Sequence, residues 1–173
     1  MSEAVRLVDN LIDEHEQIGA EFESLENVSG DVEAVARLAG DRVKGDFVPR
    51  ALDDQGQGLR RWIQQLESLQ KGLREHFRRE ETALADAFKE VGTPELVKGL
   101  DDLLSEHAAL IRHIEKLRQD AEAVASGGTR IEVWEGKGWG MKYNIEQLRN
   151  EIEAHAKREN ELFRQLKSQV KSA

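Results

Sequence analysis

The chain has 173 residues, enough for one domain with its own hydrophobic core, and it carries a net charge of −9. Lysine and arginine are interspersed with acidic residues, which argues against the basic stripe of a nucleic-acid-binding surface. The absence of cysteine excludes disulfides, thiolate metal ligands and cysteine nucleophiles. Because no apolar run approaches the roughly 18 residues of a membrane span and no signal-peptide pattern is present, we expect a soluble cytoplasmic protein without a membrane partner.

Helix-favouring residues dominate the chain, and apolar residues recur at helical spacing in four long stretches. Between the second and third stretches, Gly92, Thr93 and Pro94 predict a helix stop, an N-cap and a first-turn proline. The stretches predict four helices, at about residues 2–27, up to 90, 94–125 and from 140 onward. The fold class is therefore predicted as all-α, an antiparallel up-down-up-down four-helix bundle.

Two segments depart from this pattern. Residues 29–58 hold a shorter apolar pattern followed by Pro49 and two glycines, and we expect an extra helical segment and a bend there. Residues 126–140 are rich in glycine and contain two tryptophans, which predicts a loop folded against one end of the bundle. We therefore expect a single domain over residues 1–173, with these two segments as local elaborations.

Four of the five histidines lie on the apolar faces of four different predicted helices, where a polar side chain is costly unless it is paired or bound to metal. Two glutamates each follow such a histidine by four residues, so each His-x-x-x-Glu pair shares one helix face. The six residues are His15, His76, Glu80, His107, His155 and Glu159. On the fourth predicted helix, His155 and Glu159 continue an apolar stripe that includes Leu148, Ile152, Leu162 and Leu166.

The depth of these histidines along the bundle can be compared by counting residues from the predicted helix ends. Neighbouring helices with short connections run antiparallel. At 1.5 Å per residue, His76 agrees in depth with His107, and His107 with His155, to about 3 Å. His15 agrees too if residues 29–58 pack outside the bundle. All four imidazoles are therefore expected in one layer.

A metal centre and a metal-free core are the two explanations of this layer. A lone buried histidine is more often a hydrogen-bonded core residue, and a His-x-x-x-Glu pair can be a local hydrogen bond. Those explanations would have to hold on four helices at once. Four imidazoles and two carboxylates exceed one tetrahedral zinc and fit two ions, each with two histidines and bridged by Glu80 and Glu159. Without thiolates the candidates are iron, manganese and zinc, and we expect two iron ions.

The order His15, His76-x-x-x-Glu80, His107, His155-x-x-x-Glu159 resembles the ligand order of the hemerythrin-like family, the HHE cation-binding domain. The resemblance covers nearly the whole chain. It implies a non-haem di-iron centre with an oxo or hydroxo bridge, held by these six residues in an up-down-up-down bundle.

Two positions depart from the oxygen-carrying hemerythrins. Those proteins have a second histidine on the third helix, where this chain has Ile111, and an aspartate five residues after the last histidine, whereas Glu159 follows His155 by four. His113 lies about 120° off the apolar stripe and is expected on a flank or surface. The chain is therefore more similar to members linked to iron sensing, iron–sulfur repair, or handling of nitric oxide and peroxide than to oxygen carriers.

Three functions remain open from the sequence. The first is a redox or sensing protein whose site takes oxygen, peroxide or nitric oxide as a small ligand. The second is a non-enzymatic module that binds or senses iron, or binds oxygen. The third is a metal-free helical interaction protein. Whether the protein is an enzyme and what its oligomeric state is do not follow from the sequence.

Glycines near two histidines indicate a place for a small ligand beside the site. Gly19 lies four residues after His15 and Gly72 four before His76, both expected on the core-facing side. An internal glycine costs about 1 kcal/mol relative to alanine, so its presence at these positions needs an explanation. The two explanations are that the glycines leave room for a ligand or that they allow close helix packing.

Other neighbours of the site give further expectations. Phe77 and Ile111 are expected to line a ligand pocket. Glu14, Glu75 and Glu106 directly precede three of the histidines and are expected on helix flanks, with a hydrogen bond to an imidazole as the alternative.

Overall fold

The computed structural model describes residues 3–40, 46–47, 58–125 and 129–172, and nearly all of these are helical. The elements in chain order are α1 (Glu3–Gly40), β1 (Asp46–Phe47), α3 (Gly58–Arg79), the π-helical turn η1 (Glu80–Leu84), α4 (Ala85–Val91), α5 (Pro94–Leu104), α6 (His107–Ala125), β2 (Thr129–Arg130) and α7 (Ile131–Ser172). The predicted helical class is confirmed. Within the described ranges, none of the helices combines the length and apolar character needed to cross a bilayer.

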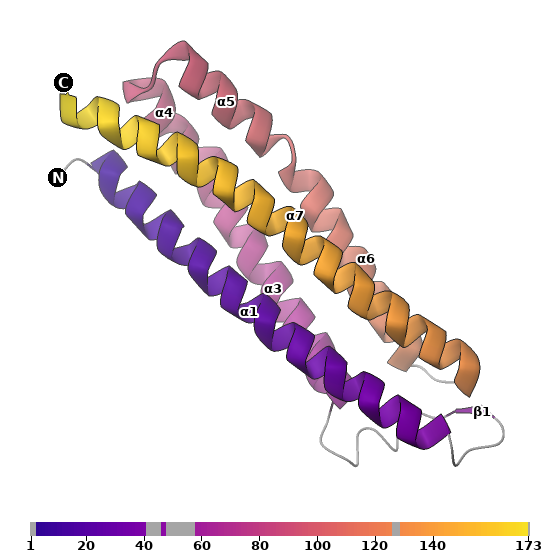
Figure 1. Cartoon of the computed structure of the whole chain (residues 1–173). Helices are drawn as coiled ribbons and strands as arrows, with labels where there is room; N and C mark the ends of the chain where they lie inside the picture. Colours follow the sequence, from indigo (N-terminus) through magenta and orange to yellow (C-terminus); the bar gives the residue numbers. More distant parts are fainter. Residues whose placement is uncertain (1–2, 41–45, 48–57, 126–128, 173) are drawn as a thin grey trace.

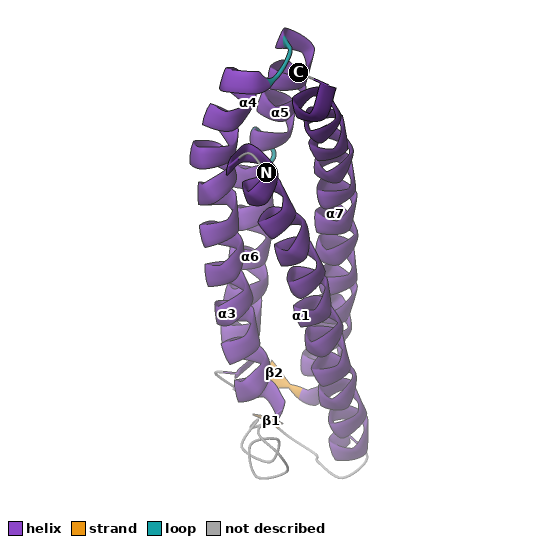
Figure 2. Cartoon of the chain, turned by 90° about the vertical axis from the view of Figure 1, so that its left-hand side faces the viewer, coloured by secondary structure: helices purple, strands orange, loops and turns teal. Residues whose placement is uncertain are grey.

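The helices form four rods, which are α1, then α3 with η1 and α4, then α5 with α6, and finally α7. These rods lie side by side along the molecule (Figure 1). α1 packs against α3 and α7, and α6 also packs against α3 and α7, so the four surround a shared interior. The short helices α4 and α5 lie at the end of the molecule that carries both termini, while β1 and β2 lie at the opposite end (Figures 1 and 2). A side chain pointing inward from any of the four rods therefore meets side chains from the others.

The two elaborations of the sequence meet in a short antiparallel strand pair. Asp46 of β1 is opposite Arg130 of β2, and Phe47 is opposite Thr129. Residues 41–45, 48–57 and 126–128 lie outside the described part of the chain. The pairing joins the segment after α1 to the segment before α7.

Two predictions about these segments were wrong. The extra helix expected within residues 29–58 is not separate, because α1 continues through residues 29–40. The loop expected at 126–140 is shorter, because residues 131–140 form the first turns of α7. The glycines of residues 131–140 predicted a loop, but an internal glycine costs only about 1 kcal/mol relative to alanine, which a long helix tolerates. A Cβ added at Gly136 or Gly140 would meet nothing within 4 Å.

Two helical rods are interrupted beside the candidate site, which the sequence did not predict. The second rod changes from α-helix to a π-helical turn at Glu80. The third is broken between α5 and α6 at residues 105–106, where the amide of Glu106 donates to the Leu103 carbonyl at 2.9 Å. Single π-helical turns inside α-helices are common at functional sites. Here, one irregularity begins at a candidate ligand, and the other ends immediately before His107.

The apolar core consists of two clusters separated along the bundle. One contains Phe22, Trp62, Leu73, Ile114 and Leu148, and the other contains Leu11, Leu84, Phe88, Leu100 and Phe163, among others. On each rod the candidate site residues fall between the two clusters in sequence, except that Phe77 of the first cluster follows His76. The site therefore forms a polar layer between two apolar parts of the core.

The predicted helix stop at Gly92–Pro94 is confirmed. Thr93 is the N-cap of α5, its side-chain oxygen accepts from the Leu96 amide at 3.4 Å, and Pro94 opens the helix. A Cβ at Gly92 would lie 2.5 Å from the Phe88 carbonyl oxygen, so this turn requires glycine. The stop thus rests on a specific contact at each of the first two positions.

We expect Thr93→Ala to lower the free energy of unfolding by about 1 kcal/mol, because the Leu96 amide loses its acceptor. Thr93→Ser keeps a hydroxyl and should stay near the wild-type value. Urea denaturation followed by circular dichroism would measure both. Indistinguishable midpoints for the alanine variant and the wild type would contradict the capping role.

Candidate metal centre

The structure brings all six candidate ligands together in one layer. His15 comes from α1, His76 from α3, Glu80 from η1, His107 from α6, and His155 and Glu159 from α7. Glu80 and Glu159 are completely buried, His76, His107 and His155 are 2 % exposed, and the His15 side chain is 7 % exposed. The depth agreement expected from residue counting is confirmed.

The four histidines form two pairs, and each of the two carboxylates directs one oxygen to a histidine of each pair. Glu80 Oε1 lies 3.1 Å from Nε2 of His76, while its Oε2 lies 3.4 Å from Nε2 of His107. Glu159 Oε2 lies 3.3 Å from Nε2 of His15, while its Oε1 lies 3.0 Å from Nε2 of His155. The carboxylates therefore lie between a His15–His76 pair and a His107–His155 pair.

In each of the four histidines of the layer, the other ring nitrogen, Nδ1, faces an acceptor outside this layer. These acceptors form an outer ring, in which Glu14 contacts His76 at 2.7 Å, Glu81 contacts His107 at 3.0 Å, Glu106 contacts His155 at 3.0 Å and Asn160 contacts His15 at 3.2 Å. Because an acceptor at Nδ1 holds the ring proton there, Nε2 is left with its lone pair directed inward.

Sequence reasoning found part of this outer ring. Glu14 and Glu106 do bind imidazoles, but those of another rod and not of the histidine that follows them. Glu75 instead accepts from Arg78 at 3.3 Å on the surface. Glu81 and Asn160 were missed, and their sequence signal is that each directly follows a candidate ligand carboxylate.

Several inner nitrogen and oxygen atoms of the layer are buried without a hydrogen-bond partner among the described residues. The four oxygens of Glu80 and Glu159 and Nε2 of His15 are buried without a hydrogen bond of good geometry. The Nε2 atoms of His107 and His155 lie 3.1 Å apart. Lone pairs facing one another in a buried layer are costly unless cations or protons lie between them.

Two cations fit this arrangement. Two ligand atoms that each lie about 2.1 Å from one ion, at roughly 90–109°, are about 3.0–3.4 Å apart. The nitrogen–oxygen spacings here run from 3.0 to 3.8 Å. Two groups of four residues each offer ligand atoms within 4.8 Å of one another, namely His15, His76, Glu80 and Glu159, and Glu80, His107, His155 and Glu159. Both carboxylates belong to both groups, as a bridging role requires.

Without a cation, protons stabilise the layer. Burial by itself would lower the pKa of His15, but the Glu159 and Glu80 carboxylates outweigh it and raise this pKa to about 9. Burial would likewise raise the pKa of Glu159, but contacts with His107, His15 and His155 hold it well below its usual range. The same carboxylate raises the pKa of His155 against the effect of burial. The metal-free layer is therefore one of ion pairs.

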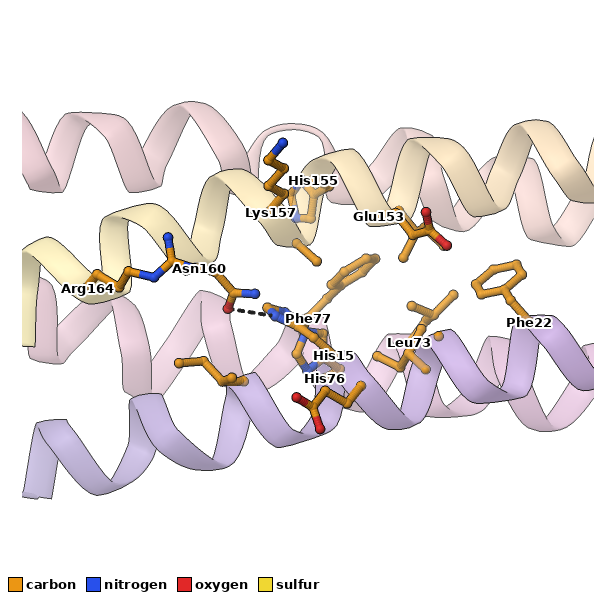
Figure 3. Close-up of a pocket in the computed structure, with 16 residues that line it drawn as sticks. His15, Phe22, Leu73, His76, Phe77, Glu153, His155, Lys157, Asn160 and Arg164 are labelled. Atoms are coloured by element: carbon orange, nitrogen blue, oxygen red, sulfur yellow. Dashed lines mark hydrogen bonds between the residues drawn. The ribbon is translucent and has the colours of Figure 1, made fainter.

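A cavity of about 270 Å³ adjoins the layer between α1, α3 and α7. His15, His76, His155 and Phe77 are among its lining residues (Figure 3). Gly19 also lines it, and a Cβ at this position would meet nothing within 4 Å. Close helix packing therefore does not explain Gly19, and the expectation that it leaves space beside the site agrees with the structure.

Three neighbouring residues lie elsewhere. Gly72 is exposed, so its expected position on the core-facing side was wrong. Ile111 lines a separate hollow beside His107, together with Phe77. His113 contacts Glu151 at 2.9 Å away from the layer, as its rotation on the helix predicted.

We expect Glu106→Ala to weaken metal binding about 10- to 100-fold, because His155 loses the acceptor that orients its ring. Glu75→Ala is the matched control, since Glu75 also directly precedes a site histidine but contacts Arg78 on the surface. Competition with a coloured chelator would measure both affinities. Equal affinities for the two variants would contradict a positioning role for the outer ring.

A second prediction concerns pH. In the metal-free protein the His15 pKa is raised from 6.5 to about 9, so its contribution to stability is complete below pH 6.5 and is lost as the pH rises through 9. Metal binding needs the neutral ring, so metal affinity should rise over the same interval. Urea denaturation and metal titration at several pH values test this. His15→Gln should reduce the pH dependence of stability, and an equally steep dependence in that variant would count against the assignment.

Comparison with known proteins agrees with this geometry. The family model for the hemerythrin HHE cation-binding domain matches residues 6–166, which include all six inner residues and the whole outer ring. Searches of curated proteins and of solved structures found no match. A match over nearly the whole chain, together with a buried His/Glu layer that can hold cations, establishes that the chain belongs to the hemerythrin HHE cation-binding domain family.

Proposed function

We propose that this protein is a non-haem di-iron protein whose centre interacts with oxygen, peroxide or nitric oxide in a redox, stress-related or iron-related role. The six inner residues His15, His76, Glu80, His107, His155 and Glu159 hold the two ions. Glu80 and Glu159 bridge them, and an oxo or hydroxo group completes the bridge. The four rods form an antiparallel up-down-up-down bundle of the hemerythrin type, located in the cytoplasm.

One observation carries the proposal. Four imidazoles donate outward through Nδ1 and direct Nε2 toward two fully buried carboxylates, whose oxygens have no well-formed hydrogen bonds in the described structure. Every Nδ1 of the layer has a hydrogen-bond partner, whereas the Nε2 atoms and the carboxylate oxygens direct lone pairs toward one another. Cations placed between these lone pairs would bind them. This supports a metal centre over a metal-free interaction protein.

The number of ligands suits either zinc or iron, and the proposed external ligand favours iron. Each four-residue group offers two imidazoles and two carboxylate oxygens, which would complete a tetrahedral zinc site. Six-coordinate iron with the same ligands keeps positions open for a bridge and for an external ligand. A bound iron pair supplies redox chemistry and Lewis acidity toward dioxygen, peroxide or nitric oxide. Manganese is the alternative with similar ligand preferences.

The protein residues beside the centre favour a ligand-binding role over simple iron storage. The cavity is lined by His15 and His76 of one pair and by His155 of the other, so it adjoins both proposed ion positions. Phe77 stacks on His107 with ring centroids 3.9 Å apart, so apolar atoms cover the imidazole and limit water there. Ile111, in place of the further histidine of oxygen carriers, favours reactive or sensing chemistry over reversible oxygen carriage.

Aerobically purified protein should contain about two irons per chain and show an oxo-to-iron band in the near ultraviolet. His76→Ala and Glu159→Ala should each lower the iron content, since each removes a proposed ligand. His113→Ala is the matched control, because His113 contacts Glu151 away from the layer. Elemental analysis with absorption spectroscopy would measure these effects.

Three outcomes bear on the alternatives. Absence of metal and of the band after iron-replete expression would exclude the di-iron protein and favour a metal-free role. Retention of both irons in both ligand variants would contradict the assigned residues. Peroxide turnover or oxygen uptake by the loaded protein distinguishes a reactive centre from a module that only binds or senses iron.

A further inference from the structure

The cavity beside the metal layer is much larger than a diatomic molecule or peroxide requires. Its volume is about 270 Å³. An apolar cavity of about 150 Å³ in another protein is large enough to bind benzene. Dioxygen, nitric oxide or hydrogen peroxide would therefore leave most of this cavity without contacts. Its size fits a ring-sized organic molecule.

The lining of the cavity differs along its length. Phe22 and Leu73 lie on the side away from Asn160, and the exposed Glu153 lies on that side as well (Figure 3). Ile18 and Ile152 also belong to this apolar part, whereas Ile12, which packs with the other core cluster, lines the opposite part. On the other side Asn160 and Arg164 provide polar groups, and Lys157 lies beside His155 (Figure 3). A molecule that matches this lining has an apolar body and one polar end.

The polar end meets hydrogen-bond donors and positive charge. The Asn160 Oδ1 atom accepts from His15, which fixes the amide and leaves the Nδ2 hydrogens to serve another acceptor. Lys157 has no ion pair within 4 Å among the residues that the structure describes. Glu16 and Glu153 also line the cavity and balance Lys157 and Arg164 in formal charge. Two divalent cations held by two carboxylates would add net positive charge, which favours an anionic end at the centre.

We propose that this cavity binds a small organic anion, an apolar ring or short chain that carries one carboxylate-like end. The anionic end lies at the metal pair beside His15 and Asn160, within reach of Lys157. The apolar body lies against Phe22, Leu73 and Ile152. This inference rests on the proposed metal centre for the anionic end, whereas the apolar part depends on the cavity alone.

Benzoate, acetate and benzyl alcohol are suitable probes for the metal-loaded protein in isothermal titration calorimetry. Benzoate should bind about 10- to 100-fold more tightly than acetate, the range expected from burial of a phenyl-sized group. It should also bind more tightly than benzyl alcohol, which has the same ring without charge. Lys157→Gln should reduce the preference for benzoate over benzyl alcohol about two- to five-fold, the range of a partly exposed ion pair.

Two glycines offer a matched pair of variants that test the location. Gly19→Leu places a side chain in the cavity and should weaken benzoate binding at least about tenfold. Gly72→Leu makes the same change at an exposed helical position and should leave binding unchanged. Both substitutions raise helix propensity, so both variants should fold, and their metal content should equal that of the wild type.

Benzyl alcohol titrated into metal-free protein tests the cavity without the centre. Binding of benzyl alcohol that is weakened by Gly19→Leu and not by Gly72→Leu would support the apolar part of the inference. This holds even if the protein takes up no iron, although the absence of iron would overturn the proposed di-iron function. The inference is overturned if benzoate binds the loaded protein no more tightly than acetate. It is equally overturned if Gly19→Leu binds benzoate as the wild type does.

Discussion

Two fully buried carboxylates determine how this bundle is built. Glu80 and Glu159 have no access to water. Their carboxylate oxygens lie 3.0–3.8 Å from the imidazole nitrogens that face them. Such a layer is stable only when positive charge, from protons or metal ions, lies within it. The four rods must therefore hold a common register, because a shift of one helical turn would move an imidazole about 5.4 Å from its place. The apolar clusters on either side of the layer hold that register by packing.

The outer ring follows from helix geometry. Consecutive residues on an α-helix are about 100° apart, so when one residue points to the centre of a bundle its neighbour points sideways toward an adjacent helix. Each member of the ring uses this relation, since Glu14, Glu81, Glu106 and Asn160 are each next in sequence to an inner residue. The positions of the imidazoles are thus coupled from rod to rod around the bundle. Arg79 and Arg158 in turn hold Glu14 and Glu106, each at 2.6 Å, so the network extends to the surface.

The sequence was sufficient for the features that depend on periodicity. Six polar residues in phase with apolar stripes predicted the inner layer, and counting along the helices predicted its common depth. Two members of the outer ring, Glu14 and Glu106, were predicted on helix flanks, but their partners were not, because which helix adjoins which flank is a tertiary property. The π-helical turn at Glu80 and the break before His107 have no periodic signal at all. The same limit applies near the end of α7, where Phe163 is fully buried and Leu162, predicted on the stripe, is only partly buried.

The two proposed metal positions have the same inner ligands, so any difference between them arises outside the inner layer. Three imidazoles donate to carboxylates, whereas His15 donates to the neutral amide of Asn160. A carboxylate acceptor draws the Nδ1 proton more strongly and makes the ring a stronger electron donor to its metal, which an amide does less. A metal ion held by His15 and His76 would therefore receive less electron density, and the amide that causes this also lines the cavity. Asn160 thus belongs both to the outer ring that distinguishes the two proposed positions and to the lining of the cavity.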